Sequence, residues 1–529
     1  MSRTKTSSRR GKRNTDVTVA ACSKKQKKEL EKTIESTVAN ASAATDCKKG
    51  SHQWAESTLI KLLGGMSLDT FESQYFEKKP LHVRKVDKGV LFTSDLFSRK
   101  KLIKIMEKES RSMRFGTDLT VCRYIQSKRQ DFHGDDSNGH ATSRQVANLL
   151  NKGYSCQFYQ PQRYVDGLYE LNAAFEEVFG GLAGASAYLT PANSQALAPH
   201  YDDIEAFVMQ TQGRKKWKLY HPSVELAGEH STDLAVDQLG EPWMELTVEE
   251  GDLLYFPRGV VHQACTDQEQ FSTHVTISVY QHNTWANFME VALPHVIRQA
   301  FDSNVAFRKG LPLRYLGYMG TQFPPDSAKA KEFTATFRKL LGQLVAHVGD
   351  KDLQEASDMA ALDMLANRLP PPGETKDDES SPSPLDDNVT IRFKNRSHIR
   401  LSMGEDEMKE AFVAVYFSQH NCRRHHMGLC TCDGGDGESK EDVEDDDSGD
   451  AGEDAENGSV DGDQLPPQPK SIVFPGELAP ALMKLYASSS TTHGASIDEL
   501  AGATSNVTAL HGMLLRLWSE GLLDVARQL

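Results

Sequence analysis

Long apolar runs and a dense cysteine pattern are both missing from this 529-residue sequence. No run of about 20 apolar residues, the length that spans a bilayer, occurs in it, and we recognise no signal peptide. The few cysteines are scattered widely: Cys22, Cys47, Cys122, Cys156, Cys265, Cys422, Cys430 and Cys432. This scatter argues against a disulfide-stapled secreted fold, and we expect free thiols in a reducing compartment.

Acidic charge is concentrated in one place. The net charge is −14, and residues 433–463 hold fifteen acidic residues and one lysine, so the rest of the chain is balanced. This stretch has almost no apolar side chains to offset the entropy of ordering, and we expect a disordered insert. At the other end, residues 1–50 carry thirteen Lys and Arg against five Asp and Glu. Such a basic arm favours a nuclear or nucleolar address or an RNA contact, with a solubilising tail as the alternative.

The length exceeds what a single core usually covers, so two or three folded units are expected. The composition and periodicity suggest these divisions: a basic arm at 1–50, a catalytic unit with lead-in helices at 51–285, a helical region at 286–369, a linker at 370–386, and a last domain at 387–529 that contains the acidic insert.

Within the catalytic unit, short strand-like runs alternate with turns. The runs are 187–189, 205–210, 215–220, 244–248, 252–256 and 273–281, with Gln212-Gly213 predicted to form a hairpin turn. Many short antiparallel strands predict a double-stranded jelly roll.

A metal site is predicted from three residues. His200 and Asp202 are two positions apart in an extended segment, so both side chains point to one face. His262 follows a strand and the turn Pro257-Arg-Gly259, which bends the chain so that the imidazole points back. Two histidines and one carboxylate with open positions are what a non-haem iron oxygenase requires.

Lys215 is predicted to point inward. Strand parity places Lys215, Trp217 and Leu219 on one face, and Lys216 and Lys218 on the opposite, solvated face. An ammonium in an apolar cavity requires an anion, and a dicarboxylate cosubstrate would supply one.

A polar strand face accompanies these residues. His274, Thr276, Ser278 and Tyr280 alternate with apolar residues, so the polar set can supply donors to the same anion. Tyr188, Asn193 and Asn283 fall near the predicted mouth and are candidates for substrate contact, although each also fits a structural role.

The later part of the chain carries three further patterns. An apolar stripe over residues 337–348 has helical spacing, which predicts either core packing or a homodimer interface. The end of the chain alternates short strands with three helices and suggests a winged-helix shape. Its expected reading helix has only His511 and Arg516 as positive residues, so we expect protein contact and no sequence-specific DNA binding. The cluster Cys422, His425, His426, Cys430 and Cys432 fits no standard zinc spacing.

Three motifs carry a family resemblance: NSQALAPHYDDIEAF at 193–207, GRKKW at 213–217, and GDLLYFPRG at 251–259 followed by His262. They resemble the JmjC-type ribosomal oxygenases, described as bifunctional histidyl hydroxylases and histone lysine demethylases, and the likeness extends from residue 54 to the end of the chain. The resemblance implies an α+β fold with a cupin-like double-stranded β-helix, a helical homodimerisation region and a winged-helix-like domain. It also implies iron(II) held by His200, Asp202 and His262, and a nuclear or nucleolar location. The cosubstrates it implies are O2 and 2-oxoglutarate, the latter bound by Lys215 with His274 and Ser278 nearby.

Two positions depart from the family pattern. Ser186 stands where an asparagine is expected near the cosubstrate, and Gln157 where an arginine is expected near the substrate. Both departures leave iron and cosubstrate binding intact in principle and bear on the identity of the substrate. The resemblance favours hydroxylation of a ribosomal-protein histidine, with histone lysine demethylation as the alternative within the class. A catalytically silent cupin-like scaffold is the rival from another class, and the intact triad and the inward lysine argue against it.

Overall fold

The computed structural model describes residues 48–84, 93–109, 113–125, 128–135, 138–373, 382–427, 468–490 and 494–527. The acidic insert predicted at 433–463 and residues 1–47 of the predicted basic arm lie outside these ranges. Within the described part of the chain, no helix has the length and apolar character needed to cross a membrane.

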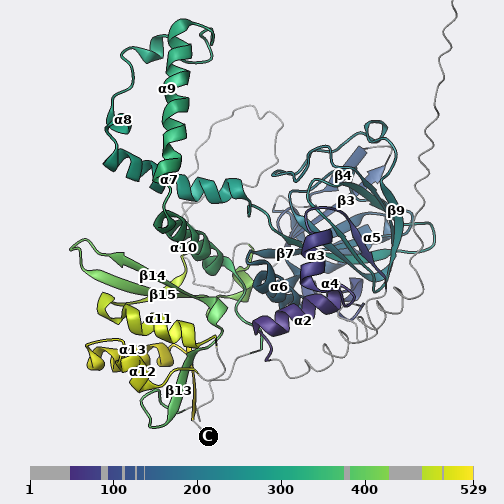
Figure 1. The fold of residues 1–529 in the computed structure, drawn as a ribbon. Helices are drawn as coiled ribbons and strands as arrows, with labels where there is room; N and C mark the ends of the chain where they lie inside the picture. Colours follow the sequence, from purple (N-terminus) through teal and green to yellow (C-terminus); the bar gives the residue numbers. More distant parts are fainter. Residues whose placement is uncertain are drawn as a thin grey trace, which may run out of the picture. The chain divides into compact units, whose positions relative to one another are not determined.

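The central element is a ten-stranded antiparallel sheet (Figure 1). Its strands in chain order are β1 (Leu81–Val83), β3 (Leu119–Ile125), β4 (Lys128–Phe132), β6 (Ser155–Tyr159), β7 (Ala183–Thr190), β8 (Glu205–Tyr220), β9 (Met244–Glu249), β10 (Leu253–Phe256), β11 (Val261–Cys265) and β12 (Ser272–Val279). Neighbours run in the order β1-β10-β8-β12-β7-β6-β3-β4, and β9 and β11 also pair with β8. The antiparallel pairing agrees with the predicted jelly-roll core.

Strand β8 corrects one prediction. Gln212-Gly213 was expected to form a hairpin turn, but Glu205–Tyr220 is one continuous strand of 16 residues. Its first half pairs with β10 and β12, and its second half pairs with β9 and β11. Gly213 marks the passage between these partners: its φ is +65°, and an added Cβ would lie 1.9 Å from the carbonyl oxygen of Phe271. The glycine therefore permits a close backbone approach where β12 leaves β8, and no reversal of the chain occurs.

Helices from the N-terminal part of the catalytic unit pack against this sheet. They are α2 (His52–Leu62), α3 (Leu68–Gln74), α4 (Arg99–Lys108), α5 (Ser143–Asn151) and α6 (Asp166–Phe179), with the short strands β2 (Met113–Arg114) and β5 (His140–Ala141) between α4 and α5. Helix α2 begins after the cap Ser51, and α6 ends at Gly180 in a left-handed conformation, as the sequence around Gly180-Gly181 predicts. Phe71 of α3 packs on Phe207 and Tyr255 with ring centroids 5.8 Å and 4.9 Å away, which ties the lead-in helices to the sheet.

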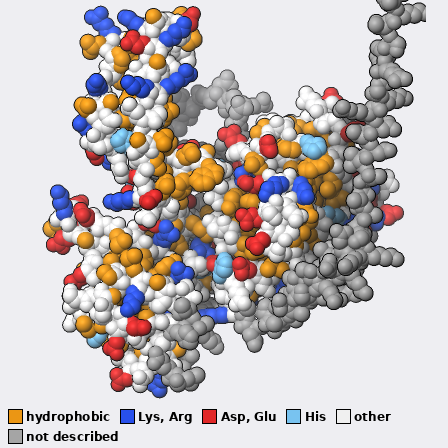
Figure 2. All heavy atoms as spheres, in the orientation of Figure 1, with side chains coloured by type: hydrophobic (Ala, Val, Ile, Leu, Met, Phe, Trp, Pro, Cys, Tyr) orange, Lys and Arg blue, Asp and Glu red, His pale blue; other side chains and the backbone are white. Residues whose placement is uncertain are grey.

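A helical region follows the sheet. It consists of α7 (Trp285–Ser303), α8 (Val305–Arg308), α9 (Ala328–Leu344) and α10 (Asp350–Asn367). Helix α7 packs against α10, and its inward residues Val296 and Ala300 form a small core with Leu344 of α9. That core is small, and many apolar side chains of the region stay exposed among Lys and Arg residues (Figure 2).

The last part of the chain has its own hydrophobic core. Its elements are β13 (Val389–Phe393), β14 (Ile399–Glu405), β15 (Ala411–Phe417), β16 (Lys470–Pro475), α11 (Ala479–Ser488), α12 (Ile497–Ala501), α13 (Val507–Ser519) and β17 (Leu523–Arg527). Strands β14, β15 and β16 form one antiparallel sheet, and β13 pairs with β17. The three helices and the strands β13 and β16 were predicted from the sequence, whereas β14, β15 and β17 were not.

Residues that follow β15 join this last part to the catalytic sheet. The Nε2 atom of His426 lies 2.7 Å from Oε1 of Glu176 on α6, and its Nδ1 atom lies 2.9 Å from Nε2 of Gln162. Both carboxylate and imidazole are buried. Because both ring nitrogens of His426 are engaged, this side chain is not available as a zinc ligand, in line with the sequence analysis.

Candidate metal and anion site

Backbone pairing brings the three predicted metal ligands together. His200 and His262 form an isolated antiparallel bridge, with each backbone N–H donating to the other residue's carbonyl, at 3.2 Å and 2.8 Å. The backbone N–H of Gly259 also donates to the carbonyl of Asp202 at 2.9 Å. Strand β11, which presents His262, was not predicted, although the turn before it was. These contacts fix the loop of His200 and Asp202 against the strand of His262.

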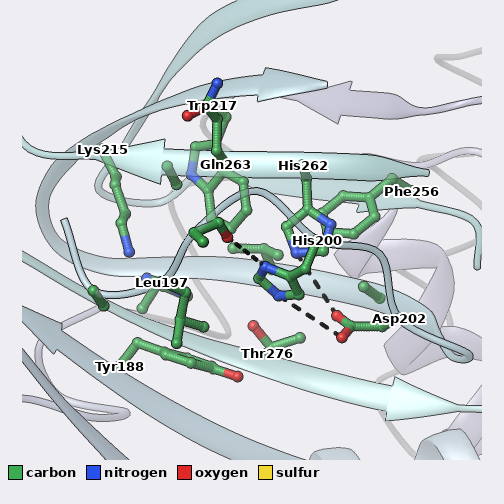
Figure 3. Close-up of a pocket in the computed structure, with 16 residues that line it drawn as sticks. Tyr188, Leu197, His200, Asp202, Lys215, Trp217, Phe256, His262, Gln263 and Thr276 are labelled. Carbon is green, nitrogen blue, oxygen red and sulfur yellow. Dashed lines mark hydrogen bonds and ion pairs between the residues drawn. The ribbon is translucent and has the colours of Figure 1, made fainter. Parts of the chain in front are cut away.

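The side chains converge on one point (Figure 3). The Nε2 atom of His200 lies 3.8 Å from Oδ1 of Asp202, and that of His262 lies 3.7 Å from Oδ2. One ligand atom from each of the three residues falls within 4.8 Å of the others, and no other such group of three is found in the part of the chain that the structure describes. A two-histidine, one-carboxylate set of this kind suits iron(II) and leaves coordination positions open.

The histidine tautomers fit metal binding. The Nδ1 atoms lie next to backbone carbonyls, that of Ala198 at 2.8 Å for His200 and that of Val260 at 3.1 Å for His262. A carbonyl oxygen only accepts, so each Nδ1 carries the proton and each Nε2 lone pair faces Asp202. Burial, reinforced by His200, lowers the pKa of His262 to about 4, so its imidazole is neutral near pH 7. Both rings are thus held in the form that ligates a metal.

Lys215 points into the same cavity, as strand parity predicted. Lys215, Trp217 and Leu219 are buried, whereas Lys216 is exposed. The ammonium of Lys215 donates to Oγ1 of Thr190 at 3.3 Å, and burial lowers the pKa of Lys215 to about 8. A buried amine with a neutral partner is a site for an anion.

The cavity has about 530 Å³ of empty space, including its open mouth. The residues that line it are Tyr188, Ala196, Leu197, Ala198, His200, Asp202, Ala206, Val208, Lys215, Trp217, Phe256, His262, Gln263, Ala264, His274 and Thr276. Figure 3 shows Lys215 at one end and Asp202 at the other. A small dicarboxylate between them would reach both the ammonium and a metal.

The remaining predicted residues divide into two groups. His274 lines the cavity, and its ring stacks on Tyr188 with the centroids 4.8 Å apart. Burial, with a contribution from Lys215, holds the pKa of His274 well below its usual value. Ser278 is not among the lining residues, and Thr276 of the same strand face takes that place.

Two candidate substrate residues lie outside the cavity lining. Asn193 and Asn283 are exposed, and neither borders the cavity. Gln157 donates to the hydroxyl of Tyr188 at 3.0 Å, so this departure from the family pattern lies directly behind a lining residue. Trp217 and Gln263 line the cavity but were not predicted as site residues; for Trp217, its shared strand face with Lys215 was the available signal.

Comparisons with known proteins agree with this geometry. A family model described as JmjC domain matches residues 157–288. The chain is 32% identical over 386 residues to the bifunctional lysine-specific demethylase and histidyl-hydroxylase NO66 of Aedes aegypti, covering 68% of this chain and 57% of that protein. It is 38% identical over 314 residues to human ribosomal oxygenase 1, covering 59% of this chain and 47% of that protein. The chain thus spans about half the length of these two relatives.

A mouse relative is matched along most of its length. Ribosomal oxygenase 2 of Mus musculus is 34% identical over 412 residues, which cover 73% of this chain and 85% of that protein. Among solved structures, the ribosomal oxygenase YcfD of Escherichia coli in complex with cobalt and succinic acid matches with a TM-score of 0.42 and 13% identity, over 87% of this chain and 98% of that one. That structural likeness is too distant to add to the argument. On the extent of the match to the mouse protein, the chain belongs to the family of JmjC-domain ribosomal oxygenases.

Proposed function

We propose that this chain is an iron(II)- and 2-oxoglutarate-dependent protein oxygenase. The observation that carries the proposal is the arrangement of His200, Asp202 and His262, whose Nε2 and carboxylate oxygen atoms face one point while both Nδ1 atoms are held by backbone carbonyls. The names of the relatives support it, since they are named as oxygenases, histidyl hydroxylases and lysine demethylases.

The residues present fit both the metal and the cosubstrate. His200, Asp202 and His262 would hold the iron, and Lys215 would pair with the distal carboxylate of 2-oxoglutarate at the other end of the cavity. When bound, iron(II), 2-oxoglutarate and O2 together supply the oxidising power that replaces a substrate C–H bond by C–OH, with succinate and CO2 as the other products. The apolar side chains of Leu197, Val208 and Phe256 limit water access around these groups.

The substrate we propose is a histidine side chain of a ribosomal protein. The names of the relatives support this choice, because one is named a histidyl-hydroxylase and another a ribosomal oxygenase. The name lysine-specific demethylase supports a second candidate, in which hydroxylation of an N-methyl group on a histone lysine leads to demethylation. In either case we place the protein in the nucleus and nucleolus, on the basis of the basic arm at 1–50.

We also propose a homodimer formed through the helical region. Helix α7 presents Trp285, Met289, Leu293, Ile297 and Phe301 at four-residue spacing, and these side chains are 79%, 52%, 38%, 48% and 51% exposed. A further exposed set, Phe337, Leu341 and Val345, continues on α9 and the turn after it. A stripe of this size is typical of a surface that a partner covers. For the last domain we propose a winged-helix-like unit that contacts protein.

Asp202→Ala provides the main test of the proposed function. The substitution removes the only anionic ligand, so we expect loss of iron(II) binding in an anaerobic titration and loss of 2-oxoglutarate turnover with it. Mass spectrometry of ribosomal proteins and histones incubated with the wild-type enzyme identifies the modified residue. Retention of hydroxylation by Asp202→Ala would sink the oxygenase assignment, and absence of keto-acid turnover in an iron-loaded wild-type protein would favour the scaffold.

A further inference from the structure

Two polar atoms in the cavity have no hydrogen-bond partner in the described part of the chain: Nε1 of Trp217 and Nδ1 of His274. Both residues line the cavity and are buried, with 4% and 2% of their surface exposed. Buried polar groups in folded proteins are almost always paired, because an unpaired one loses its hydration without compensation. These two atoms therefore point to a ligand.

Trp217 is the more informative of the two. A histidine nitrogen donates or accepts according to the tautomer, whereas an indole N–H only donates. The missing partner of Trp217 must therefore be an acceptor, such as a carboxylate oxygen. Trp217 also has no other polar atom in its side chain, so its effect on a ligand can be separated from a charge effect.

The position of Trp217 indicates which carboxylate it meets. The ammonium of Lys215, two residues earlier on the same face of β8, lies 5.6 Å from the centre of the indole ring. The ring centre of His262, a proposed metal ligand, lies 6.0 Å from that of Trp217. Trp217 thus lines the cavity between its cationic end and its metal end. A carboxylate bound to Lys215 has a second oxygen for a second donor.

We propose that the indole N–H of Trp217 donates a hydrogen bond to the distal carboxylate that Lys215 pairs, which makes Trp217 a cosubstrate-binding residue. The inference rests on the proposed function, because it takes 2-oxoglutarate as the ligand. As a neutral donor, Trp217 would favour a dicarboxylate ligand. The distal carboxylate would in turn be the acceptor for the unpaired indole nitrogen.

Trp217→Phe tests the proposal, because it removes the N–H and keeps an aromatic ring. The full chain is loaded with zinc(II), which does not turn over, and the dissociation constant of 2-oxoglutarate is measured by calorimetry. Loss of a hydrogen bond to a charged group should weaken binding about tenfold or more. The affinity for 2-oxobutyrate, which lacks the distal carboxylate, should change less than about twofold. Trp243→Phe, at a 36% exposed tryptophan outside the cavity, is the control.

A second measurement follows the indole N–H directly in the wild-type protein and uses the variant only to assign its resonance. In the wild-type protein labelled with 15N-tryptophan, the indole resonance that is absent from Trp217→Phe should move downfield on addition of 2-oxoglutarate and stay in place with 2-oxobutyrate. A Trp217→Phe protein that binds 2-oxoglutarate as the wild type does, while Lys215→Ala does not, would overturn the inference and leave the proposed function intact. Equal weakening of both keto acids would also overturn it. A zinc-loaded wild-type protein that binds no 2-oxoglutarate would instead contradict the proposed function itself.

Discussion

Lys215 combines a binding role with a cost to stability. Its side chain is buried, and burial lowers its pKa from 10.5 to about 8. A lysine whose folded pKa is depressed contributes stability above its unfolded pKa, and this contribution is lost as the pH falls through about 8. At neutral pH the buried Lys215 is therefore a cation whose desolvation destabilises the fold.

Lys215→Met should accordingly stabilise the ligand-free protein near neutral pH, by up to about 3 kcal/mol, because methionine fills similar space without charge. The gain should shrink as the pH rises from about 8 toward the unfolded pKa of about 10.4, above which both states are neutral. The same variant should lose the thermal stabilisation that 2-oxoglutarate gives the wild type. Unfolding in urea and thermal shift with the keto acid measure the two effects. The exposed Lys216→Met is the matched control, and an equal effect there would contradict the assigned roles.

Glu205 is a second buried ionisable group near the metal ligands. Its carboxylate is 0% exposed, the hydroxyl of Tyr255 donates to it, and the backbone N–H of Arg258 donates at 3.4 Å. The Arg258 guanidinium lies 4.0 Å from this carboxylate and also pairs with Glu77 at 2.5 Å. Burial raises the pKa of Glu205 to about 7, against the opposing effects of the Tyr255 and Arg258 hydrogen bonds.

The sign of the resulting pH dependence follows from this raised pKa. The protonated carboxyl stabilises the fold below the unfolded pKa of about 4.3, and that contribution is lost as the pH rises through about 7. Glu205→Gln mimics the protonated form. The free energy of unfolding of the wild type, relative to Glu205→Gln, should therefore fall by up to about 3 kcal/mol between about pH 4.5 and pH 8. A difference that stays constant over this range would show that Glu205 remains ionised throughout.

Helix α7 has one buried face and one exposed apolar face. One face, with Ala292, Val296 and Ala300, packs inside the chain, whereas the stripe from Trp285 to Phe301 stays exposed. For the apolar stripe at 337–348, the sequence predicts either core packing or a homodimer interface. The structure adds a longer exposed stripe on α7. Pro294 interrupts the helical pattern of this segment, which makes the stripe harder to recognise in the sequence.

Ile297→Arg should convert the proposed dimer to a monomer, because it places a charge in the middle of the apolar stripe where a partner would have to desolvate it. Light scattering coupled to size-exclusion chromatography measures the mass. Asp302→Arg places the same side chain outside the stripe, with a charge change one unit larger, and should leave the dimer intact. A wild-type protein that is already monomeric at micromolar concentration would contradict the interface.

At the scale of the whole molecule, polar contacts fasten residues at the end of the helical region and after β15 to the helices that flank the catalytic sheet. Arg368 pairs with Glu177 at 3.1 Å with both side chains almost fully buried, Arg424 pairs with Glu109 at 3.0 Å, and Glu176 accepts from both His426 and the backbone of Leu369. These contacts come from residues on the N-terminal side of the predicted acidic insert. The insert is therefore not required to supply them.

Deletion of residues 433–463 should leave turnover within a few-fold of the intact chain and leave the thermal midpoint nearly unchanged, because the stretch has almost no apolar side chains to offset the entropy of ordering. The control is Glu176→Gln, which keeps the shape but weakens the buried pair with His426 and should lower the midpoint. A deletion variant without activity would show that the acidic residues act on the site.

The sequence by itself determined those features that depend on local periodicity. A period of two placed His200 with Asp202 and Lys215 with Trp217. Gly180 marked the end of a helix, and the motifs around His262 indicated the family. Only the tertiary structure decided features that depend on distant partners. Gly213 looks like a hairpin residue locally, yet β8 continues through it because β12 leaves and β9 and β11 take over the pairing. His426, in a cysteine- and histidine-rich segment, pairs with a glutamate 250 positions earlier. Trp217 is a candidate cosubstrate-binding residue only because its indole nitrogen is buried without a partner among the described residues. Whether a buried polar group has a partner depends on neighbours that the local sequence does not contain.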